Sequence, residues 1–226
     1  MITAGSTGCA LVGSCFHLGL QKGLLQPALA SALPTQNGKW VILCDCGSNL
    51  HPKAKDLADY ARLSAAFAKA YYADRQGEAF LPKAGLVNVG KEEGKGTALQ
   101  QEAFALLSSL SGTDYVFAGN IEGTDILSGD VDVAVCDGFT GNVLLKALEK
   151  AGNIAAGFAE TYTPEESGKQ IAEKIRATFD YNNRAGAVFL GTKKLLIKAH
   201  GAATEDTITS CILQAVRLLE GGIGRR

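Results

Sequence analysis

The 226-residue sequence lacks a marked excess of charge of either sign, a long apolar run and any internal repeat. The formal net charge is −1, so a basic surface that would bind a nucleic acid is not predicted. No apolar run reaches the roughly 20 residues that a transmembrane helix requires. These absences exclude repeat proteins and single-span membrane proteins, and we expect a globular chain with no nucleic-acid partner.

Paired cysteine motifs are also missing, because none of the six cysteines forms a C-x-x-C pair: Cys9, Cys15, Cys44, Cys46, Cys136 and Cys211. Most lie in apolar runs, where a reduced cysteine acts as a small hydrophobic residue. With no visible signal peptide, we expect free thiols and a cytoplasmic location. A zinc site built from Cys46, His51 and a distant ligand is the weaker alternative, so we predict neither a metal nor a cofactor.

Glycine and apolar residues are abundant: the chain has 27 glycines, and 46% of its residues are hydrophobic. The glycines cluster in short loops between apolar runs, which indicates tight turns close to bound ligands. The apolar content suffices for a real core. We predict one α/β domain over residues 1–226, with a helical excursion over 147–185.

Strands and helices alternate along the sequence. We predict strands over four short apolar runs bounded by turn residues: 39–45, 84–89, 115–120 and 131–137. Helical patterns are found over 53–72, after a capping box formed by Thr97 and Gln100, and from about residue 142.

The C-terminal part predicts a strand pair, "AVFL" and "KLLIKAHG", and then a last helix capped by Thr204 or Asp206. Five residues of this helix are expected to face inward: Ile208, Cys211, Ile212, Ala215 and Leu219. The alternation as a whole favours a mostly parallel sheet with helices on both faces.

Four glycine-containing loops follow predicted strands: 3–8, 44–49, 88–96 and 136–142. In parallel sheets, ligands bind beyond the carboxyl ends of the strands, so these loops are where chemistry is expected. In the third loop a lysine, Lys95, stands between two glycines just ahead of a helix. A helix N-terminus is a poor place for a cation but a good one for an anion, so this loop is a candidate phosphate site.

A nucleotide-binding P-loop is the obvious rival, and the sequence does not support it. Gly85, Gly90 and Lys91 have the required spacing, but Glu92 stands where the Ser or Thr that binds magnesium should be. The dinucleotide fingerprint G-x-G-x-x-G is absent as well. Structural roles stay open for single residues: a solvated turn at Gly-Lys-Gly, a turn at Asp137 and a helix cap at Asn142.

Three segments together closely resemble the bacterial phosphate acyltransferase family of phospholipid synthesis, the PlsX family. These are "GLVNVGKEEGKG", "AGNIEGTDILSGDVDVAVCDGFTGNVLLK" and "LLIKAHGAA". The resemblance runs from "TAGSTG" to the last helix. It implies a fold like those of isocitrate and isopropylmalate dehydrogenases and phosphate acetyltransferases. It also implies transfer of an acyl group from acyl carrier protein to inorganic phosphate, a homodimer and a peripheral membrane contact.

The resemblance also implies roles for residues of this chain. Lys95 matches the family's motif lysine and is expected to pair with phosphate or with the developing oxyanion. Asp137 and Asn142 match the "DGF-x-GN" motif and are expected to orient phosphate or the thioester. Further substrate-binding candidates are Asn49, Asn88, Glu93, Gly94, Gly96, Asn120, Gly138, Gly141 and His200. A cysteine that carries the acyl group is disfavoured, because no cysteine has a neighbour in sequence that could act as its base.

The sequence departs from the family pattern in three ways. It begins at "MITAGSTGCALVG", so we expect that an N-terminal region with a "DAMGGD"-like loop is missing. Ser6 and Thr97 replace asparagines that are usual in the family. The segment "TYTPEESGKQ" predicts a solvated helix start in place of an apolar membrane tip. The alternatives are therefore a phosphate acyltransferase that uses short-chain acyl-coenzyme A and a non-catalytic, dimerising fragment.

Overall fold

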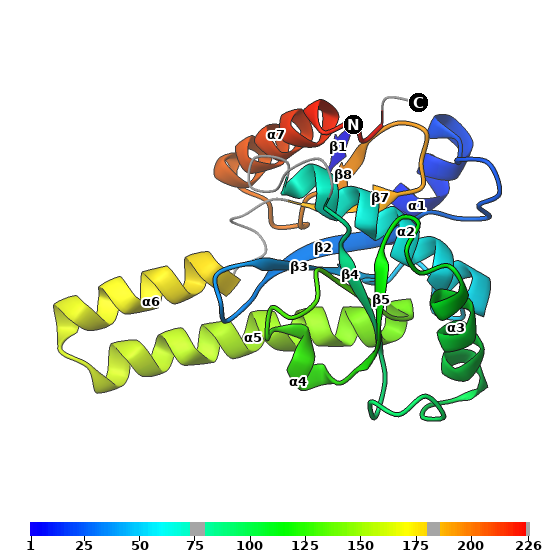
Figure 1. Ribbon diagram of the computed structural model, residues 1–226. Helices are drawn as coiled ribbons and strands as arrows, with labels where there is room; N and C mark the ends of the chain where they lie inside the picture. Colours follow the sequence, from blue (N-terminus) through cyan, green and yellow to red (C-terminus); the bar gives the residue numbers. More distant parts are fainter. Residues whose placement is uncertain (73–79, 180–185, 225–226) are drawn as a thin grey trace.

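The computed structural model describes residues 1–72, 80–179 and 186–224. Helices pack against an eight-stranded sheet (Figure 1). The strands are β1 (Ile2–Thr3), β2 (Ala28–Pro34), β3 (Trp40–Cys44), β4 (Lys83–Val87), β5 (Val116–Ile121), β6 (Val133–Val135), β7 (Ala187–Leu190) and β8 (Leu196–Lys198). The helices are α1 (Thr7–Gly13), the π-helix η1 (Ser14–Leu18), α2 (Ala54–Tyr71), α3 (Ala98–Ser109), α4 (Gly123–Ile126), α5 (Gly138–Tyr162), α6 (Glu165–Phe179) and α7 (Glu205–Glu220).

The strand order is β1-β8-β7-β2-β3-β6-β4-β5. The four neighbours β3, β6, β4 and β5 are mutually parallel, whereas β2 runs antiparallel to both β3 and β7. At the other end, β8 is antiparallel to β7 and parallel to β1. The predicted α/β class with a mostly parallel sheet is confirmed, because the four strands that follow one another in the βα pattern form its parallel half.

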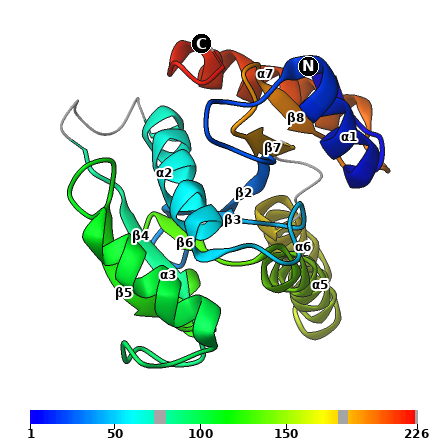
Figure 2. The same ribbon diagram turned by 90° about the vertical axis from the view of Figure 1, so that its right-hand side faces the viewer.

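Both faces of the sheet are covered, as predicted. In β3, Ile42 and Cys44 belong to one buried cluster and Val41 and Leu43 to the other, as expected for a strand buried on both faces. The first cluster contains buried residues of α2, α3 and α7, and the second contains residues of α1, α4 and α5. Figure 2 shows α2 and α3 side by side on their face of the sheet.

Local signals located several elements correctly. The predicted strands at 39–45 and 115–120 are β3 and β5, and the helix predicted over 53–72 is α2. The capping box of Thr97 and Gln100 is present at the start of α3. One boundary was wrong: α5 begins at Gly138 instead of near 142. The reason is that the Asp137 carboxylate accepts the backbone N–H of Thr140 at 2.9 Å and starts the helix there.

Two features differ from the expectation. Strand β2 was not predicted, because "ALASALP" consists mainly of small residues without the β-branched pattern of a typical strand. Thr204 caps α7 as predicted, but Ile212 and Leu219 are 50% and 39% exposed instead of facing inward. The buried face of α7 is narrow and consists of Thr207, Cys211, Gln214 and Leu218.

Helices α5 and α6 form an antiparallel hairpin that extends away from the sheet (Figure 1). Two charged hydrogen bonds of 2.6 and 2.9 Å join Arg176 of α6 to Glu160 of α5. Helix α6 begins at Glu165, which agrees with the predicted helix start in "TYTPEESGKQ". The excursion predicted over 147–185 is helical as far as Phe179, and its residues 180–185 lie outside the described part of the chain.

Candidate functional site

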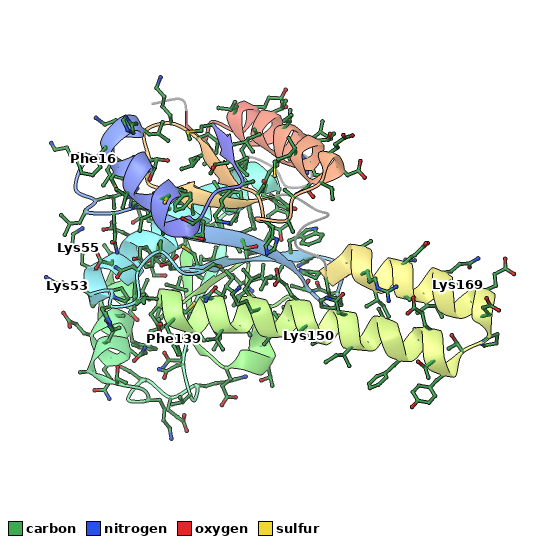
Figure 3. The ribbon with its side chains drawn as sticks, turned by 180° about the vertical axis from the view of Figure 1, so that it is seen from behind. Phe16, Lys53, Lys55, Phe139, Lys150 and Lys169 are labelled. Atoms are coloured by element: carbon green, nitrogen blue, oxygen red, sulfur yellow. The ribbon has the colours of Figure 1, made fainter. Side chains whose placement is uncertain are left out.

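Three of the four predicted loops lie at one edge of the sheet. Strands β3, β6 and β4 are parallel neighbours, so residues 45–49, 136–142 and 88–97 all follow carboxyl ends at that edge. Figure 3 shows Phe139, at the start of α5, on the same side of the molecule as Lys53 and Lys55, at the start of α2. The fourth loop, at 3–8, follows β1, which three strands separate from β3 in the sheet order.

Three side-chain amides hold the loop that contains Lys95 in place through hydrogen bonds. Each donates to one backbone carbonyl of the loop: Asn88 to Lys95 at 3.1 Å, Gln101 to Gly94 at 2.9 Å and Asn120 to Glu92 at 2.8 Å. Within the part of the chain that the structure describes, the N–H groups of Gly94 and Gly96 have no acceptor. A loop whose carbonyls are occupied and whose N–H groups are open can bind an anion.

Lys95 stands at the exposed rim of this loop. Its side chain is 51% exposed, and the nearest carboxylate oxygen, from Glu92, is 4.0 Å from its Nζ. Gly96 has a φ of +86°, and an added Cβ would lie 2.5 Å from Oδ1 of Asn88. Glycine is therefore required at 96 both for the backbone conformation and for the close approach of Asn88. The ammonium group is thus positioned by a tight turn and is accessible to a ligand.

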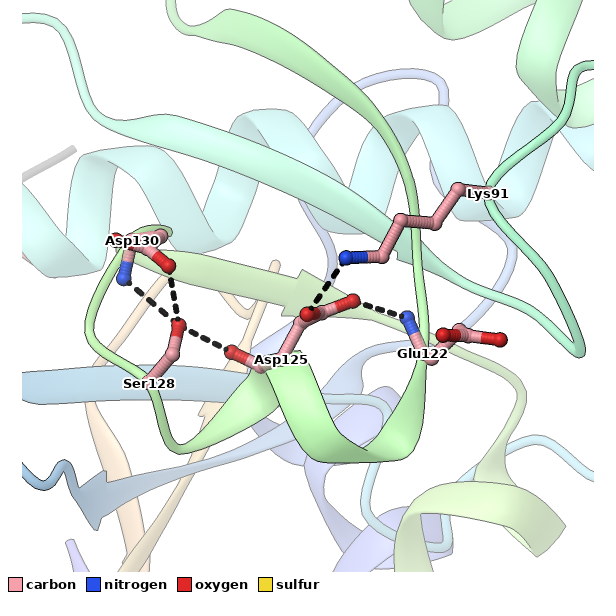
Figure 4. Close-up of polar contacts among 5 residues, drawn as sticks. All are labelled: Lys91, Glu122, Asp125, Ser128 and Asp130. Carbon is pink, nitrogen blue, oxygen red and sulfur yellow. Dashed lines mark hydrogen bonds and ion pairs between the residues drawn. The ribbon is translucent and has the colours of Figure 1, made fainter.

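A second tether, which no sequence motif predicts, joins the same loop to α4 (Figure 4). Nζ of Lys91 lies 2.9 Å from Oδ1 of Asp125, whose Oδ2 accepts the backbone N–H of Glu122 at 2.9 Å. The hydrogen bond from Lys91 holds the pKa of the Asp125 carboxyl below its usual value, and Asp125 raises the pKa of Lys91. The sequence offers one sign of this pair: Lys91 has the spacing of a P-loop lysine, although the Ser or Thr of that motif is absent.

Asn120 lies beneath the loop at the end of β5. It is 5% exposed, and its Nδ2 is used by the Glu92 carbonyl. Its Oδ1 has no hydrogen-bond partner among the residues that the structure describes. A buried amide oxygen without a donor is costly, so this position can accept a donor from a bound water or ligand. The predicted candidate Glu93 is exposed on the loop above.

The predicted candidate Asn49 is held in a fixed orientation. Its Nδ2 donates to the Tyr60 hydroxyl at 3.1 Å, and its Oδ1 accepts the backbone N–H of His51 at 3.1 Å. Burial raises the pKa of Tyr60, so its hydroxyl stays neutral. The backbone carbonyl of Asn49 accepts the N–H of Gly138 at 2.8 Å, which joins this loop to the start of α5.

The first turn of α5 carries the "DGF-x-GN" residues. Both carboxylate oxygens of Asp137 accept from Thr140, one from its backbone N–H and one from its hydroxyl. Gly138 and Gly141 are in close contact with the 45–49 loop, since an added Cβ at either would lie within 2.6 Å of a backbone oxygen there. The N–H of Gly138 already donates to the Asn49 carbonyl, so it is not open to phosphate.

Asn142 lies one turn into α5 and does not cap it. A Cβ added to Gly47 would be 3.5 Å from the Cβ of Asn142, so the two residues are neighbours across the site. The helix-cap alternative for Asn142 is wrong, because Asp137 has that role.

His200 is not brought to this edge. Strand β8 runs opposite to β3, so His200, just beyond its end, lies at the other edge of the sheet. There its Nδ1 accepts the N–H of Ala202 at 3.1 Å. The structure therefore separates His200 from Lys95, Asn49 and Asn142.

The three thiols nearest this edge of the sheet are buried and offer little for catalysis. Burial raises the pKa of the Cys44, Cys46 and Cys136 thiols well above the usual value.

The described residues contain no group of three His, Cys, Asp or Glu side chains that could bind a metal ion. Among the helices in the described ranges, none has the length and apolar character needed to cross a membrane.

Solved structures with this fold include two phosphotransacetylases. The enzyme from Streptococcus pyogenes superposes with a TM-score of 0.64 at 18% identity, over 97% of this chain and 63% of that one. EutD phosphotransacetylase from Staphylococcus aureus gives a TM-score of 0.61 at 12% identity, over 97% of this chain and 62% of that one. At such identities the likeness establishes the fold, which is the phosphotransacetylase type that the motifs predicted.

Sequence relatives establish the family. The phosphate acyltransferase of Clostridium novyi is 36% identical over 99% of this chain and 67% of its own length. That of Exiguobacterium sibiricum is 34% identical over 97% of this chain and 66% of its own length, so the chain spans about two thirds of such relatives. Residues 1–226 match the family described as "Fatty acid synthesis protein". The chain therefore belongs to this family, in which the relatives named here are phosphate acyltransferases.

Proposed function

We propose that this chain carries the site that transfers a fatty acyl group from acyl-[acyl carrier protein] to inorganic phosphate. The products would be acyl phosphate, for phospholipid synthesis, and the free carrier thiol. The observation that carries the proposal is the Lys95 loop, in which three side-chain amides occupy the carbonyls and leave N–H groups and an ammonium open. Such a loop suits a dianion that must be held for attack.

The chemistry needs no enzyme nucleophile. A phosphate oxygen attacks the thioester carbonyl carbon, a C–O bond forms and the carbonyl oxygen becomes an oxyanion. The tetrahedral intermediate then collapses with cleavage of the C–S bond, and the leaving thiolate takes up a proton. In this scheme Lys95 and the open N–H groups of Gly94 and Gly96 bind phosphate or the oxyanion. Asn49 and Asn142, on the facing elements, orient the thioester.

The test is phosphate-dependent release of free thiol from a long-chain acyl-[acyl carrier protein]. We expect Lys95→Ala to lower kcat by about 100-fold, the usual effect of losing one donor to a developing oxyanion. Lys39→Ala, which removes an exposed lysine in the turn between β2 and β3, is the matched control and should retain full activity. Thiol release that needs no phosphate, or an unaffected Lys95→Ala variant, would contradict the proposal.

The carrier of the acyl group is decided by the same assay. If kcat/KM is higher with a short-chain acyl-coenzyme A than with acyl-[acyl carrier protein], the alternative phosphate acyltransferase is correct. If neither substrate turns over, the non-catalytic alternative is favoured.

We further propose that the chain acts as a cytoplasmic homodimer. An exposed apolar row on α5 supports the dimer. It consists of Ile154, Phe158 and Tyr162, spaced four residues apart and 48%, 60% and 80% exposed. Sedimentation equilibrium should give a dimer that Phe158→Ser weakens. Binding of the same face to anionic lipid vesicles, with a monomer in solution, would instead support the weak peripheral membrane contact.

A further inference from the structure

Asp45 is a fully buried carboxylate that the proposed chemistry does not use. It lies just beyond β3 at 0% exposure, and no cation pairs with it among the described residues. Its two oxygens accept hydrogen bonds from five donors: the N–H groups of Leu29, Gly47, Ser48 and Asn49 and the Ser48 hydroxyl, at 2.6 to 3.2 Å. Burial raises the pKa of this carboxyl, and the hydrogen bonds from Asn49, Leu29 and Ser48 oppose the shift.

These donors come from two separate elements. Leu29 belongs to β2, whereas Gly47, Ser48 and Asn49 form the loop that leads to α2. The shortest of the hydrogen bonds, at 2.6 Å, comes from Asn49. A carboxylate so fully occupied determines the path of the backbone that surrounds it.

Asp45 also contacts the start of α5. A Cβ added to Gly138 would lie 2.8 Å from its Oδ2, and one added to Gly141 would lie 1.9 Å from its backbone oxygen. The same backbone oxygen accepts the Cys136 thiol, and the Asp45 N–H donates to the Cys136 carbonyl at 2.9 Å. The loop at 45–49 and the first turn of α5 are therefore built around one residue.

We propose that Asp45 is the positioning residue of the site: its carboxylate fixes Asn49 and the first turn of α5, with Asn142, in one relative arrangement. Since it is wholly buried, Asp45 acts through these residues and does not touch a substrate. The inference rests on the proposed acyl transfer. An error of about 1 Å in the placement of a substrate-orienting group can cost 100-fold in rate.

The test variant is Asp45→Asn, which keeps the shape but turns an N–H₂ group toward N–H donors. We expect kcat to fall by about 100-fold. A matched control is Leu196→Ala in β8, a buried residue away from the site, which should lower the unfolding temperature yet keep kcat. Because Asp45 acts through Asn49, the double variant Asp45→Asn/Asn49→Ala should be no slower than the slower single variant.

Hydrogen exchange of backbone amides tests the inference without an activity measurement. In Asp45→Asn we expect faster exchange of the amides at 46–50 and 137–142, including Gly138, and unchanged exchange in β5 and β8. This readout still decides the question if the wild-type chain is inactive. The inference is overturned if exchange accelerates evenly across the chain, or if kcat falls no further than in Leu196→Ala.

Discussion

Gly152 of α5 and Phe179 of α6 lie so close that a Cβ added to Gly152 would be 2.4 Å from the Cβ of Phe179. The two helices of the hairpin therefore approach each other where one of them has no side chain. The Glu160–Arg176 pair stabilises the same hairpin nearer its tip. The hairpin thus combines a close contact near its base with a bidentate ion pair nearer its tip.

Gly152→Ala should destabilise the protein, because the added methyl group overlaps the Phe179 side chain. Overpacking of this kind costs about 1 to 3 kcal/mol in the free energy of unfolding. Gly157→Ala is the control on the same helix, because apart from the adjacent backbone of α5 no described residue lies within 4 Å of the added Cβ. The control should be neutral or more stable by up to about 1 kcal/mol, since alanine favours helix over glycine. Urea unfolding measures both, and equal values for the two variants would refute the contact.

Asn120→Ala should reduce acyl transfer more than it reduces stability. The variant loses the hydrogen bond to the Glu92 carbonyl, but it also removes the buried oxygen that has no partner. We therefore expect a stability change of about 1 kcal/mol or less. Because the Lys95 loop loses one of its three side-chain amide hydrogen bonds, kcat should fall at least tenfold, by analogy with other misplaced groups. Steady-state kinetics and thermal unfolding of the same sample separate the two effects.

The Lys91–Asp125 ion pair should stabilise the folded protein only above acidic pH. Lys91 lowers the pKa of Asp125 in the folded protein, so the pair contributes stability at pH values above the unfolded pKa of about 3.9. This contribution disappears as the pH falls through the lowered folded value. The difference in Tm between wild type and Asp125→Asn should therefore narrow below about pH 4. It should stay small at every pH, because the lysine is exposed, and a difference that widens in acid would contradict the pair.

Asp137→Ser separates capping from direct participation in the reaction. Serine is a good N-cap, so this variant should retain the helix start, whereas Asp137→Ala should lose about 1 kcal/mol of unfolding free energy. Because Thr140 occupies both carboxylate oxygens, we expect Asp137→Ser to keep kcat within about tenfold of wild type. A serine variant that is stable but inactive would show that the carboxylate itself is needed by the substrate.

Much of the candidate site could be predicted because its signals are local. The strand-loop-helix order around Lys95 follows from an apolar run, glycines and a capping box, and each of these acts within a few residues. Parallel neighbouring strands then bring 44–49, 88–96 and 136–142 to one edge. The arrangement of parallel strands predicts that Asn142 lies near Gly47, but it does not predict the distance between the two residues.

The alternating α/β pattern, the capped start of α3 and the glycine turn that positions Lys95 can all be predicted from local sequence, because they depend on backbone preferences of adjacent residues. Three other features are visible only in the folded chain: the antiparallel insertion of β2, the separation of His200 from the site and the burial of Asp45. Strand direction and the burial of a carboxylate depend on partners distant in the chain: Asp45 is satisfied partly by Leu29 of β2, and His200 follows the direction of β8. No local pattern of residue types specifies such partners.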